Sequence, residues 1–284
     1  MTLLIQITDT HILPPGEVLY GSIDTALHLG QTVEKINRMR PLPDAVIFTG
    51  DLVEHGDRVC YQHFIDLIEP LKSPAWVIPG NHDEPEVMLD VFSATPCFPA
   101  NRQTYQYAVE DLPFRILALN SCADGTELPE FNQRKLAWLE DQLDRSQKPV
   151  LIAIHHPPMI TGIELIDMGG AEWFQEMKSV LSRYSQVKLV ICGHCHTDLS
   201  GRIGQVPVYM APANSYQLIA SRGLKIAPAT LNEPGVPTLH HFIDGDFLSG
   251  SQPWPVNVEE QRIDRKSGIS WEKLKKAMMG NRAG

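Results

Sequence analysis

The chain has 284 residues, with 24 Lys and Arg against 34 Asp and Glu, so its formal net charge is -10. Hydrophobic residues make up 43% of the sequence, which excludes extensive disorder and allows one large α/β domain or two small ones. The acidic balance argues against a long nucleic acid as partner, because proteins that grip its backbone usually present a basic face.

The sequence predicts neither a signal peptide nor a membrane span. Its first basic residue is Lys35, and the apolar start at residues 3–5 meets Asp9 too early for a signal segment. No stretch approaches the ~20 apolar residues that cross a bilayer. The five cysteines are too few for a disulfide framework in a chain of this length. We therefore expect a cytoplasmic protein without membrane contact.

Short apolar runs alternate with amphipathic segments over the first two-thirds of the chain. Strands are predicted at residues 3–8, 45–49, 76–79, 115–120, 150–154 and 187–192, and helices at 23–40, 132–145 and 172–184. Strands that alternate with helices of this length imply right-handed crossovers and a largely parallel sheet.

After about residue 198, Gly, Pro, Ser and Asn become frequent and the helical pattern fades. We expect strands at 206–210 and 238–243, a loop or short hairpin at 221–237 and a terminal helix within 258–281. The segment 198–250 is interpreted as an appended cap or edge segment rather than a second full domain.

Polar residues follow five of the predicted strands. The groups are Asp9-Thr10-His11, Gly50-Asp51, Gly80-Asn81-His82-Asp83, His155-His156-Pro157-Pro158 and Gly193-His194-Cys195-His196. Because ligands of open α/β sheets bind beyond the carboxyl ends of strands, these groups are expected to converge on one rim. The glycines fit places where the backbone turns sharply or approaches another chain segment closely.

The side chains of these groups have the chemistry of metal ligands. The candidate ligands are Asp9, His11, Asp51, Asn81, His155, His194 and His196. This set is too large for one divalent ion with an open site and suits two ions that share a bridging carboxylate. A mixed N/O set without thiolate favours Fe, Mn, Zn, Co or Ni over Ca or Mg.

Such a pair of ions would be matched to a phosphodiester. Two divalent ions, two aspartates and a hydroxide sum to about +1, which suits a monoanionic substrate, and metal coordination makes hydroxide available near neutral pH. His82 is left over, and it can protonate the leaving oxygen or stabilise charge on phosphorus, with Asp83 orienting it.

These groups, in this order, resemble the motifs of the calcineurin-like metallophosphoesterase superfamily: D-x-H, G-D, G-N-H-D/E, a lone H, and G-H-x-H. The similarity spans residues 9–196 and is greatest to the class III cyclic nucleotide phosphodiesterases and bacterial glycerophosphodiesterases, with added support from residues 19–24. It implies a four-layer α/β/β/α sandwich with a C-terminal cap segment: a catalytic core at 1–197, second-sheet strands and a cap or oligomerisation segment at 198–250, and a tail at 251–284.

The resemblance also implies a role for each motif residue. Asp9, His11 and His196 would bind the first of two divalent transition metal ions (Fe, Mn, Zn or Co), Asn81, His155 and His194 the second, and Asp51 both. His82 would be catalytic, with His156 outside the metal-ligand set. The implied activity is hydrolysis of small phosphodiesters by metal-activated hydroxide, with 3′,5′-cyclic nucleotides first and glycerophosphodiesters second. A homodimer or higher homo-oligomer is implied as well.

Two positions depart from the family pattern. Cys195 lies between the last two ligand histidines, where relatives more often carry Asn or Leu, so a thiol could alter metal preference or redox sensitivity. Tyr216 stands where glycerophosphodiesterase-like members place a substrate-facing histidine, which favours the cyclic nucleotide members. Packing of the cap is the alternative role of Tyr216.

The sequence also bears on three alternative functions. Residues 192–195 read C-G-H-C, a disulfide-exchange motif, but no helical pattern follows Cys192 as that motif requires. A phosphomonoesterase would use the same metals with extra cationic groups, for which Arg202 and Arg222 are the candidates. A non-catalytic phosphate-ester sensor would normally have lost ligands. Outside the motifs, His28, His55, His63, His240 and His241 are predicted to be ordinary surface or core residues.

Overall fold

The computed structural model describes residues 1–219, 229–251 and 268–279. The chain divides into two compact units, Met1–Gln252 and Pro253–Gly284. In the second unit, the described part holds helix α8 (Trp271–Met279).

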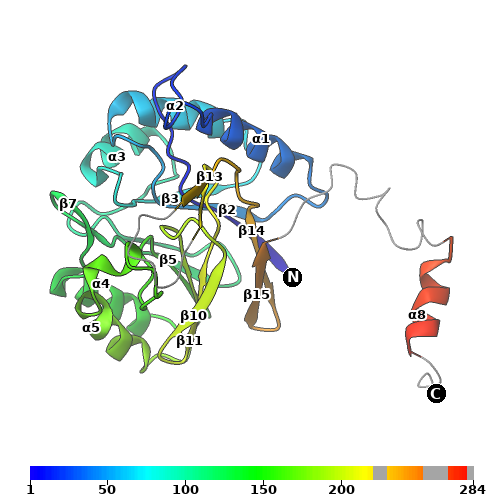
Figure 1. The fold of residues 1–284 in the computed structure, drawn as a ribbon. Coiled ribbons are helices and arrows are strands. Elements are labelled where there is room, and N and C mark those ends of the chain that lie inside the picture. The colour runs from blue at the N-terminus through cyan, green and yellow to red at the C-terminus, as the bar shows by residue number, and fades with distance from the viewer. Residues whose placement is uncertain (220–228, 252–267, 280–284) are drawn as a thin grey trace. The chain divides into compact units, whose positions relative to one another are not determined.

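Two sheets form the centre of the first unit (Figure 1). The first sheet has the order β15-β14-β1-β2-β3, formed by Asp246–Ser251, Thr238–Ile243, Thr2–Ile7, Ala45–Thr49 and Ala75–Ile78. The second has the order β10-β11-β9-β8-β5-β4, formed by Leu199–Ile203, Val206–Met210, Val187–Cys192, Val150–Ala153, Arg115–Ala118 and Tyr107–Val109.

Each sheet has parallel strands at its centre and antiparallel strands at an edge. Strands β1, β2 and β3 are parallel, as are β5, β8, β9 and β11, whereas β14, β15, β10 and β4 pair antiparallel with their neighbours. The strand pattern predicted one largely parallel sheet, but the described residues form two large sheets, each only partly parallel. The two sheets face each other, because Gln6 on β1 donates a hydrogen bond to the carbonyl of Cys192 on β9 over 2.9 Å.

Helices cover the outer faces of the two sheets (Figure 1). Helices α1 (Thr25–Arg38), α2 (Arg58–Ile68) and α3 (Pro85–Val91) accompany the first sheet, and α4 (Gln133–Asp144) and α5 (Glu172–Leu181) the second. Phe48 of β2 packs edge-on against Phe64 of α2 at 5.2 Å between ring centroids. Leu139 and Met177, from α4 and α5, join the core of the second sheet. The result is the expected four-layer α/β/β/α sandwich.

Local signals explain where several helices begin. The side chains of Asp24, Asp57 and Asn132 accept hydrogen bonds from the first backbone N–H groups of α1, α2 and α4. The predicted helices at 23–40, 132–145 and 172–184 are thus present with slightly shorter bounds. Helices α2 and α3 were not predicted: α3 has only seven residues, but the buried residues of α2, Cys60, Phe64 and Ile68, recur at helical spacing and are a signal that the sequence analysis missed.

The chain after residue 198 contributes to both sheets. Strands β10 and β11 extend the second sheet, and β14 and β15 extend the first. The predicted strands at 206–210 and 238–243 are present as β11 and β14. Within the predicted loop or hairpin, β13 (Ala229–Leu231) pairs with β12 (Gln217–Ile219), while 220–228 lie outside the described residues. Of the predicted terminal helix, residues 271–279 are described as α8.

Four smaller elements connect the main strands and helices. Strands β6 (Cys122–Ala123) and β7 (Thr126–Pro129) form a short hairpin. Two 3-10 turns, η1 (Phe92–Ala94) and η2 (Ile166–Gly169), follow α3 and precede α5.

Candidate metal centre

The predicted ligands come from the carboxyl ends of five strands in both sheets. Asp9 and His11 follow β1, Asp51 follows β2, Asn81 follows β3, His155 follows β8, and His194 and His196 follow β9. The loops are joined by backbone hydrogen bonds, such as those from the N–H groups of Asp9 and His11 to the carbonyls of Gly50 and Asp51, both 3.0 Å. The structure therefore brings all seven side chains to one rim between the sheets.

Several of these residues have a strained backbone. Asp9, His11, Asp51, His194 and His196 have φ angles between 45° and 67°, the left-handed region that non-glycine residues seldom occupy. Such strain persists only where the surrounding structure imposes it, and it concentrates at functional sites.

Glycines at the rim allow contacts that no larger residue permits. A Cβ atom on Gly80 would lie 2.2 Å from both the backbone nitrogen and Oδ1 of Asp51, and one on Gly193 would lie 2.0 Å from Oγ1 of Thr8. On Gly50, which also has a φ of 90°, it would lie 2.5 Å from Nδ1 of His155. The expectation of close backbone approach at these glycines is confirmed.

One half of the rim brings hydrogen-bond acceptors face to face. The Nε2 atoms of His11 and His196 are 3.2 Å apart, and Nε2 of His196 is 3.2 Å from Oδ1 of Asp9. The Nδ1 atoms of the two rings face the carboxylate of Glu54 at 2.7 Å and the carbonyl of Tyr216 at 3.0 Å. Since Nδ1 then carries the proton of each neutral ring, both Nε2 atoms direct lone pairs at one point, which fits a cation.

The other half of the rim repeats this arrangement. Nδ1 of His155 donates to the carbonyl of Thr49 over 2.9 Å, so Nε2 is the ligand atom. That Nε2 lies 3.0 Å from Oδ1 of Asn81 and 3.4 Å from Oδ2 of Asp51. Oδ2 of Asp51 is also 3.7 Å from Nε2 of His11, so this carboxylate lies between the two halves. The donor set thus fits two cations that share Asp51.

In the metal-free rim, the ionisable side chains shift the pKa values of one another. Burial opposes ionisation of Asp51 and Asp9, but the neighbouring rings, His155 and His196 above all, hold the pKa of each carboxyl below its usual value. Burial also disfavours charge on His155, yet Asp51 raises its pKa to about 9. In the metal-free protein a proton on His155 therefore stabilises the carboxylate that a cation would otherwise bind.

His156 and His194 lie against each other on the second-sheet side, with ring centroids 4.5 Å apart. Nδ1 of His156 is 2.8 Å from Oγ of Ser121, and its Nε2 is 3.3 Å from the carbonyl of Glu127. Burial, with the nearby His155 ring, lowers the pKa of His194 to about 3 and keeps it neutral. Both nitrogens of His156 thus have protein partners, whereas the described side-chain contacts of His194 leave it available to a metal.

His82 lies beside the rim and is partly exposed. Its Nδ1 donates to the backbone carbonyl of Glu54 over 3.1 Å and lies 3.6 Å from the carboxylate of Glu54. Burial lowers the pKa of His82, but the carboxylates of Asp51 and Glu54 outweigh it and raise that pKa above the usual value. The Nε2 edge of His82 is therefore the free one, and it can deliver a proton.

Glu54 is a functional residue that the sequence analysis missed. Its carboxylate holds Nδ1 of His11, and its backbone carbonyl holds Nδ1 of His82. The only signal in the sequence is its position three residues after Asp51, and no periodicity or motif marks it.

The carboxylate of Asp83 hydrogen-bonds to residues other than His82, which it was expected to orient. Its carboxylate accepts hydrogen bonds from the backbone N–H groups of Leu52 and Gly80 and from the hydroxyl of Tyr61, over 2.9 to 3.1 Å. Burial raises the pKa of Asp83 to about 7. Asp83 thus fixes the loop that carries Asn81, and the acceptor found at His82 is Glu54 instead.

Tyr216 packs over the rim. Its ring lies 4.4 Å from that of His196 and 5.9 Å from that of His11, measured between centroids. Its hydroxyl is 3.4 Å from that of Tyr20, and its carbonyl accepts the hydrogen bond from His196. It joins a small apolar cluster with Leu13 and therefore has the packing role that was weighed for it, while also lining the cavity at the metal centre.

The disulfide-exchange alternative does not fit the structure. Cys192 ends β9, both Cys192 and Cys195 are fully buried, and strand β10 follows rather than a helix. Burial raises the pKa of both thiols, which is the opposite of what a reactive cysteine needs.

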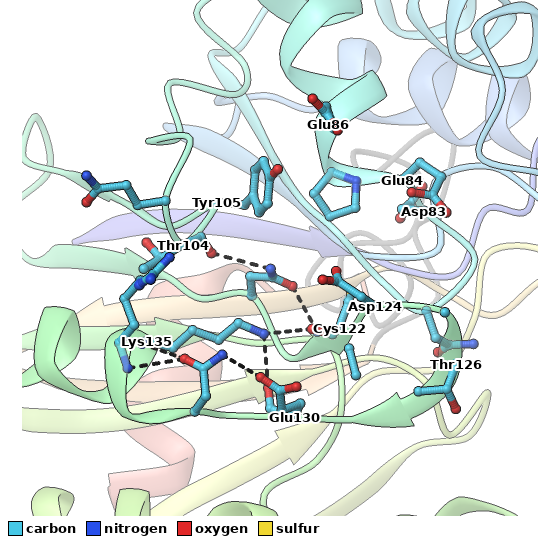
Figure 2. Close-up of a pocket in the computed structure, with 18 of the residues that line it drawn as sticks. Asp83, Glu84, Glu86, Thr104, Tyr105, Cys122, Asp124, Thr126, Glu130 and Lys135 are labelled. Carbon is cyan, nitrogen blue, oxygen red and sulfur yellow. Dashed lines mark hydrogen bonds between the residues drawn. The ribbon is translucent and has the colours of Figure 1, made fainter.

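Two cavities meet at the rim. The first, of about 140 Å³, is lined by ligands including His11, Asp51 and Asn81, together with apolar residues. The second, of about 750 Å³, shares Asn81 with the first and is lined mainly by polar residues (Figure 2). There the buried Lys135 donates from Nζ to the carbonyls of Cys122 and Glu130 over 2.6 and 3.2 Å.

Comparison with known proteins assigns the family. Residues 2–198 match the family described as calcineurin-like phosphoesterase, and the chain therefore belongs to this dimetal-dependent family and is a phosphoester hydrolase. Among the described residues, no helix is both long and apolar enough to cross a membrane.

Several proteins are similar to this chain. It is 32% identical over 249 residues to a probable glycerophosphodiester phosphodiesterase, GpdQ, of Arcobacter nitrofigilis, covering 87% of this chain and 91% of that protein. It is 29% identical over 197 residues to the 3′,5′-cyclic adenosine monophosphate phosphodiesterase CpdA of Escherichia coli, covering 69% and 70%. A dimetal phosphatase from Danio rerio shares the fold, with a TM-score of 0.61 at 16% identity, covering 88% of this chain and 98% of that one.

Proposed function

We propose that the protein hydrolyses small phosphodiesters, foremost 3′,5′-cyclic nucleotides, with glycerophosphodiesters as the second candidate. The observation that carries the proposal is the rim at which imidazole nitrogens and carboxylate or amide oxygens from five strand ends face one another within 3.0 to 3.4 Å. Relatives named as cyclic nucleotide and glycerophosphodiester phosphodiesterases support it.

Each ligand has a proposed role. Asp9, His11 and His196 would hold one divalent transition metal ion and Asn81, His155 and His194 the other, with Asp51 placed to serve both. The donor set of imidazole and oxygen suits Fe, Mn, Zn or Co. When bound, a pair of such ions supplies a nucleophile by lowering the pKa of water and neutralises charge on the phosphoryl oxygens.

The chain itself supplies proton transfer and orientation. Because Nδ1 of His82 donates to the carbonyl of Glu54, its Nε2 faces outward and can give a proton to the leaving alcohol oxygen. Three neighbouring residues support the site: Asp83 fixes the Asn81 loop, His156 the second-sheet side, and Tyr216 the ring of His196. Tyr216 also lies within reach of the substrate.

The lining of the smaller cavity, at the metal centre, favours a diester over a monoester. The described residues that line the cavity at the metal centre include no Lys or Arg, whereas a dianionic monoester gains from extra cations. Arg202 is exposed on β10, where it donates to the carbonyl of Gln205, and Arg222 lies outside the described residues.

The organisation of the whole chain follows from the same proposal. We infer a catalytic core at residues 1–197, a segment at 198–250 that completes the sandwich and builds the cap, and a tail at 251–284. In support, strands of 198–250 extend both sheets. A cytoplasmic homodimer or higher homo-oligomer is proposed from the resemblance, and sedimentation velocity of the purified protein tests the assembly.

A substrate panel with metal analysis tests the function. We expect purified protein to contain divalent transition metal and to hydrolyse bis(p-nitrophenyl) phosphate faster than p-nitrophenyl phosphate. Adenosine 3′,5′-cyclic monophosphate is expected to have a higher kcat/KM than glycerophosphoethanolamine. Faster turnover of the monoester would refute the diester proposal, and the reverse order of the two natural diesters would favour the second candidate.

A further inference from the structure

We propose that an apolar wall beside the metal centre binds an aromatic or other apolar group of the substrate alcohol, such as a nucleobase. The apolar wall consists of Leu128 on β7 and Leu165 and Met168 at η2. This inference rests on the proposed phosphodiesterase function and specifies which alcohol group the site prefers.

The side chains of the apolar wall are unusually exposed for their type. The exposed fractions are 41% for Leu128, 44% for Leu165 and 63% for Met168. Single exposed apolar residues are common, but these three line the same cavity as the metal ligands His11 and Asp51. Apolar surface gathered at a concave polar site is typical of ligand binding.

Hydrogen bonds and one close contact hold the segment that carries Leu165 and Met168 of the apolar wall. The carboxylate of Asp167 accepts hydrogen bonds from the N–H and hydroxyl of Thr161, both 2.9 Å, and from the N–H of Gly162 over 2.7 Å. Gly169 lies so close to β7 that a Cβ atom there would be 2.6 Å from Cγ of Pro129. Because the segment is fixed before substrate arrives, binding loses little conformational entropy.

The hairpin β6–β7 separates two surfaces of different polarity. Asp124 and Thr126 line the polar cavity of Figure 2, while Leu128 and Pro129 line the cavity at the metal centre. A glycerol group against the apolar wall would leave hydroxyls without partners, whereas a flat aromatic group needs none. The polarity of the wall therefore favours an aromatic alcohol group over a polyol.

The location of the wall identifies the occupant. The apolar side chains and the metal ligands belong to one small cavity, so a group bound there is within reach of a phosphoryl group at the rim. A second copy of the chain is the competing occupant, and it would change the oligomeric state rather than the choice of substrate.

Substitution of the two most exposed wall residues tests the inference. The variants are Leu165→Ser and Met168→Ser, and the matched control is Leu248→Ser on β15, whose side chain is 65% exposed and does not line the cavity. We measure kcat and KM for adenosine 3′,5′-cyclic monophosphate and for glycerophosphoethanolamine, together with metal content and sedimentation velocity.

The expected result is a change in preference between the two diesters. Each wall variant should raise KM for the cyclic nucleotide by about tenfold relative to the glycerol diester, equivalent to about 1.4 kcal/mol. The Leu248→Ser control should keep the wild-type ratio, and metal content should be equal in all proteins.

Three results would overturn the inference. An equal fall for both diesters at unchanged metal content would assign the wall a structural role, and an unchanged ratio would exclude contact with the substrate. Loss of an oligomer with an unchanged ratio would make the wall an interface between copies. Failure of the wild type to hydrolyse either diester would instead refute the underlying phosphodiesterase proposal.

Discussion

Two buried histidine clusters in the first unit differ in how their polar atoms are satisfied. Between the sheets, Nε2 of His240 is 3.0 Å from Oε1 of Gln6, and Nδ1 is 2.7 Å from Oγ of Ser249. The amide of Gln6 in turn donates to Thr49 and Cys192. At the rim, by contrast, Nε2 of one histidine faces Nε2 of another, and both face carboxylates.

The difference distinguishes a structural histidine from a metal ligand. In the inter-sheet cluster every ring nitrogen of His240 has a donor or acceptor of the protein, so the cluster is complete by itself. At the rim, Nδ1 of His11 and Nδ1 of His196 each face an acceptor of the protein. The lone pairs on their Nε2 atoms converge on one point, where they can bind a cation. Burial alone does not separate the two, because both clusters are almost fully buried.

Removing the bridging carboxylate should disrupt the rim most. Asp51→Ala deletes the one group that lies between both halves, so it should lower metal content and reduce hydrolysis of bis(p-nitrophenyl) phosphate by more than about 100-fold. The exposed Asp246→Ala is the matched control. Near-normal turnover by Asp51→Ala would contradict the proposed centre.

Loss of His82 should affect chemistry without affecting the metals. His82→Ala should lower kcat by about 10²- to 10⁴-fold, the usual contribution of a general acid, with the metal content unchanged. The exposed His55→Ala serves as the control. If metal is lost as well, His82 belongs with the ligands rather than beside them.

Neutralising Glu54 should weaken metal binding to a smaller degree. Glu54→Gln keeps the shape of the side chain and the carbonyl that holds His82, but it removes the carboxylate at His11. Outer groups of this kind usually change metal affinity by about 10- to 100-fold. Titration calorimetry of the metal-free variant measures its metal affinity, with the exposed Glu69→Gln as the control. Equal affinities of the two variants would mean that Glu54 does not contribute to metal binding.

The inter-sheet cluster should respond to pH rather than to metal. Burial, with His241 nearby, lowers the pKa of His240 to about 3, below the usual value of about 6.5. The unfolded chain therefore binds the proton more tightly, and the stability from this residue is complete above about pH 6.5 and lost as the pH falls towards 3.

Urea denaturation in buffer that contains a metal chelator measures how the free energy of unfolding depends on pH. Between about pH 6.5 and 5, the free energy of unfolding should fall more steeply in the wild type than in His240→Gln, by up to about 1.4 kcal/mol per pH unit. The exposed His55→Gln should keep the wild-type slope. Equal slopes in His240→Gln and the wild type would mean that His240 takes up no fewer protons when folded.

The sequence predicted the elements that carry strong local signals. The strands before Asp9, Asp51 and His155 are short apolar runs, and Gly50 marks the loop that follows the second of them. Parallel strands place their carboxyl ends at one edge of a sheet, so the convergence of the ligand groups could be inferred from the sequence. Helix α2 was not predicted, although its buried residues Cys60, Phe64 and Ile68 recur every four residues.

Other features depend on contacts that no local pattern records. Glu54 is defined by two hydrogen bonds to residues that are distant in sequence, and the place of Asp83 depends on Tyr61. The strained φ angles of Asp9 and His194 arise from loops that hold one another through backbone hydrogen bonds.

The sequence by itself determined the family, the set of ligand types and the order in which strands present them, because these follow from residue identity and periodicity. The tertiary structure alone decided that two sheets share the ligands, that Glu54 and not Asp83 holds His82, and that Leu165 and Met168 face the metal centre. These are products of long-range packing, in which residues far apart along the chain meet only after the sandwich has formed.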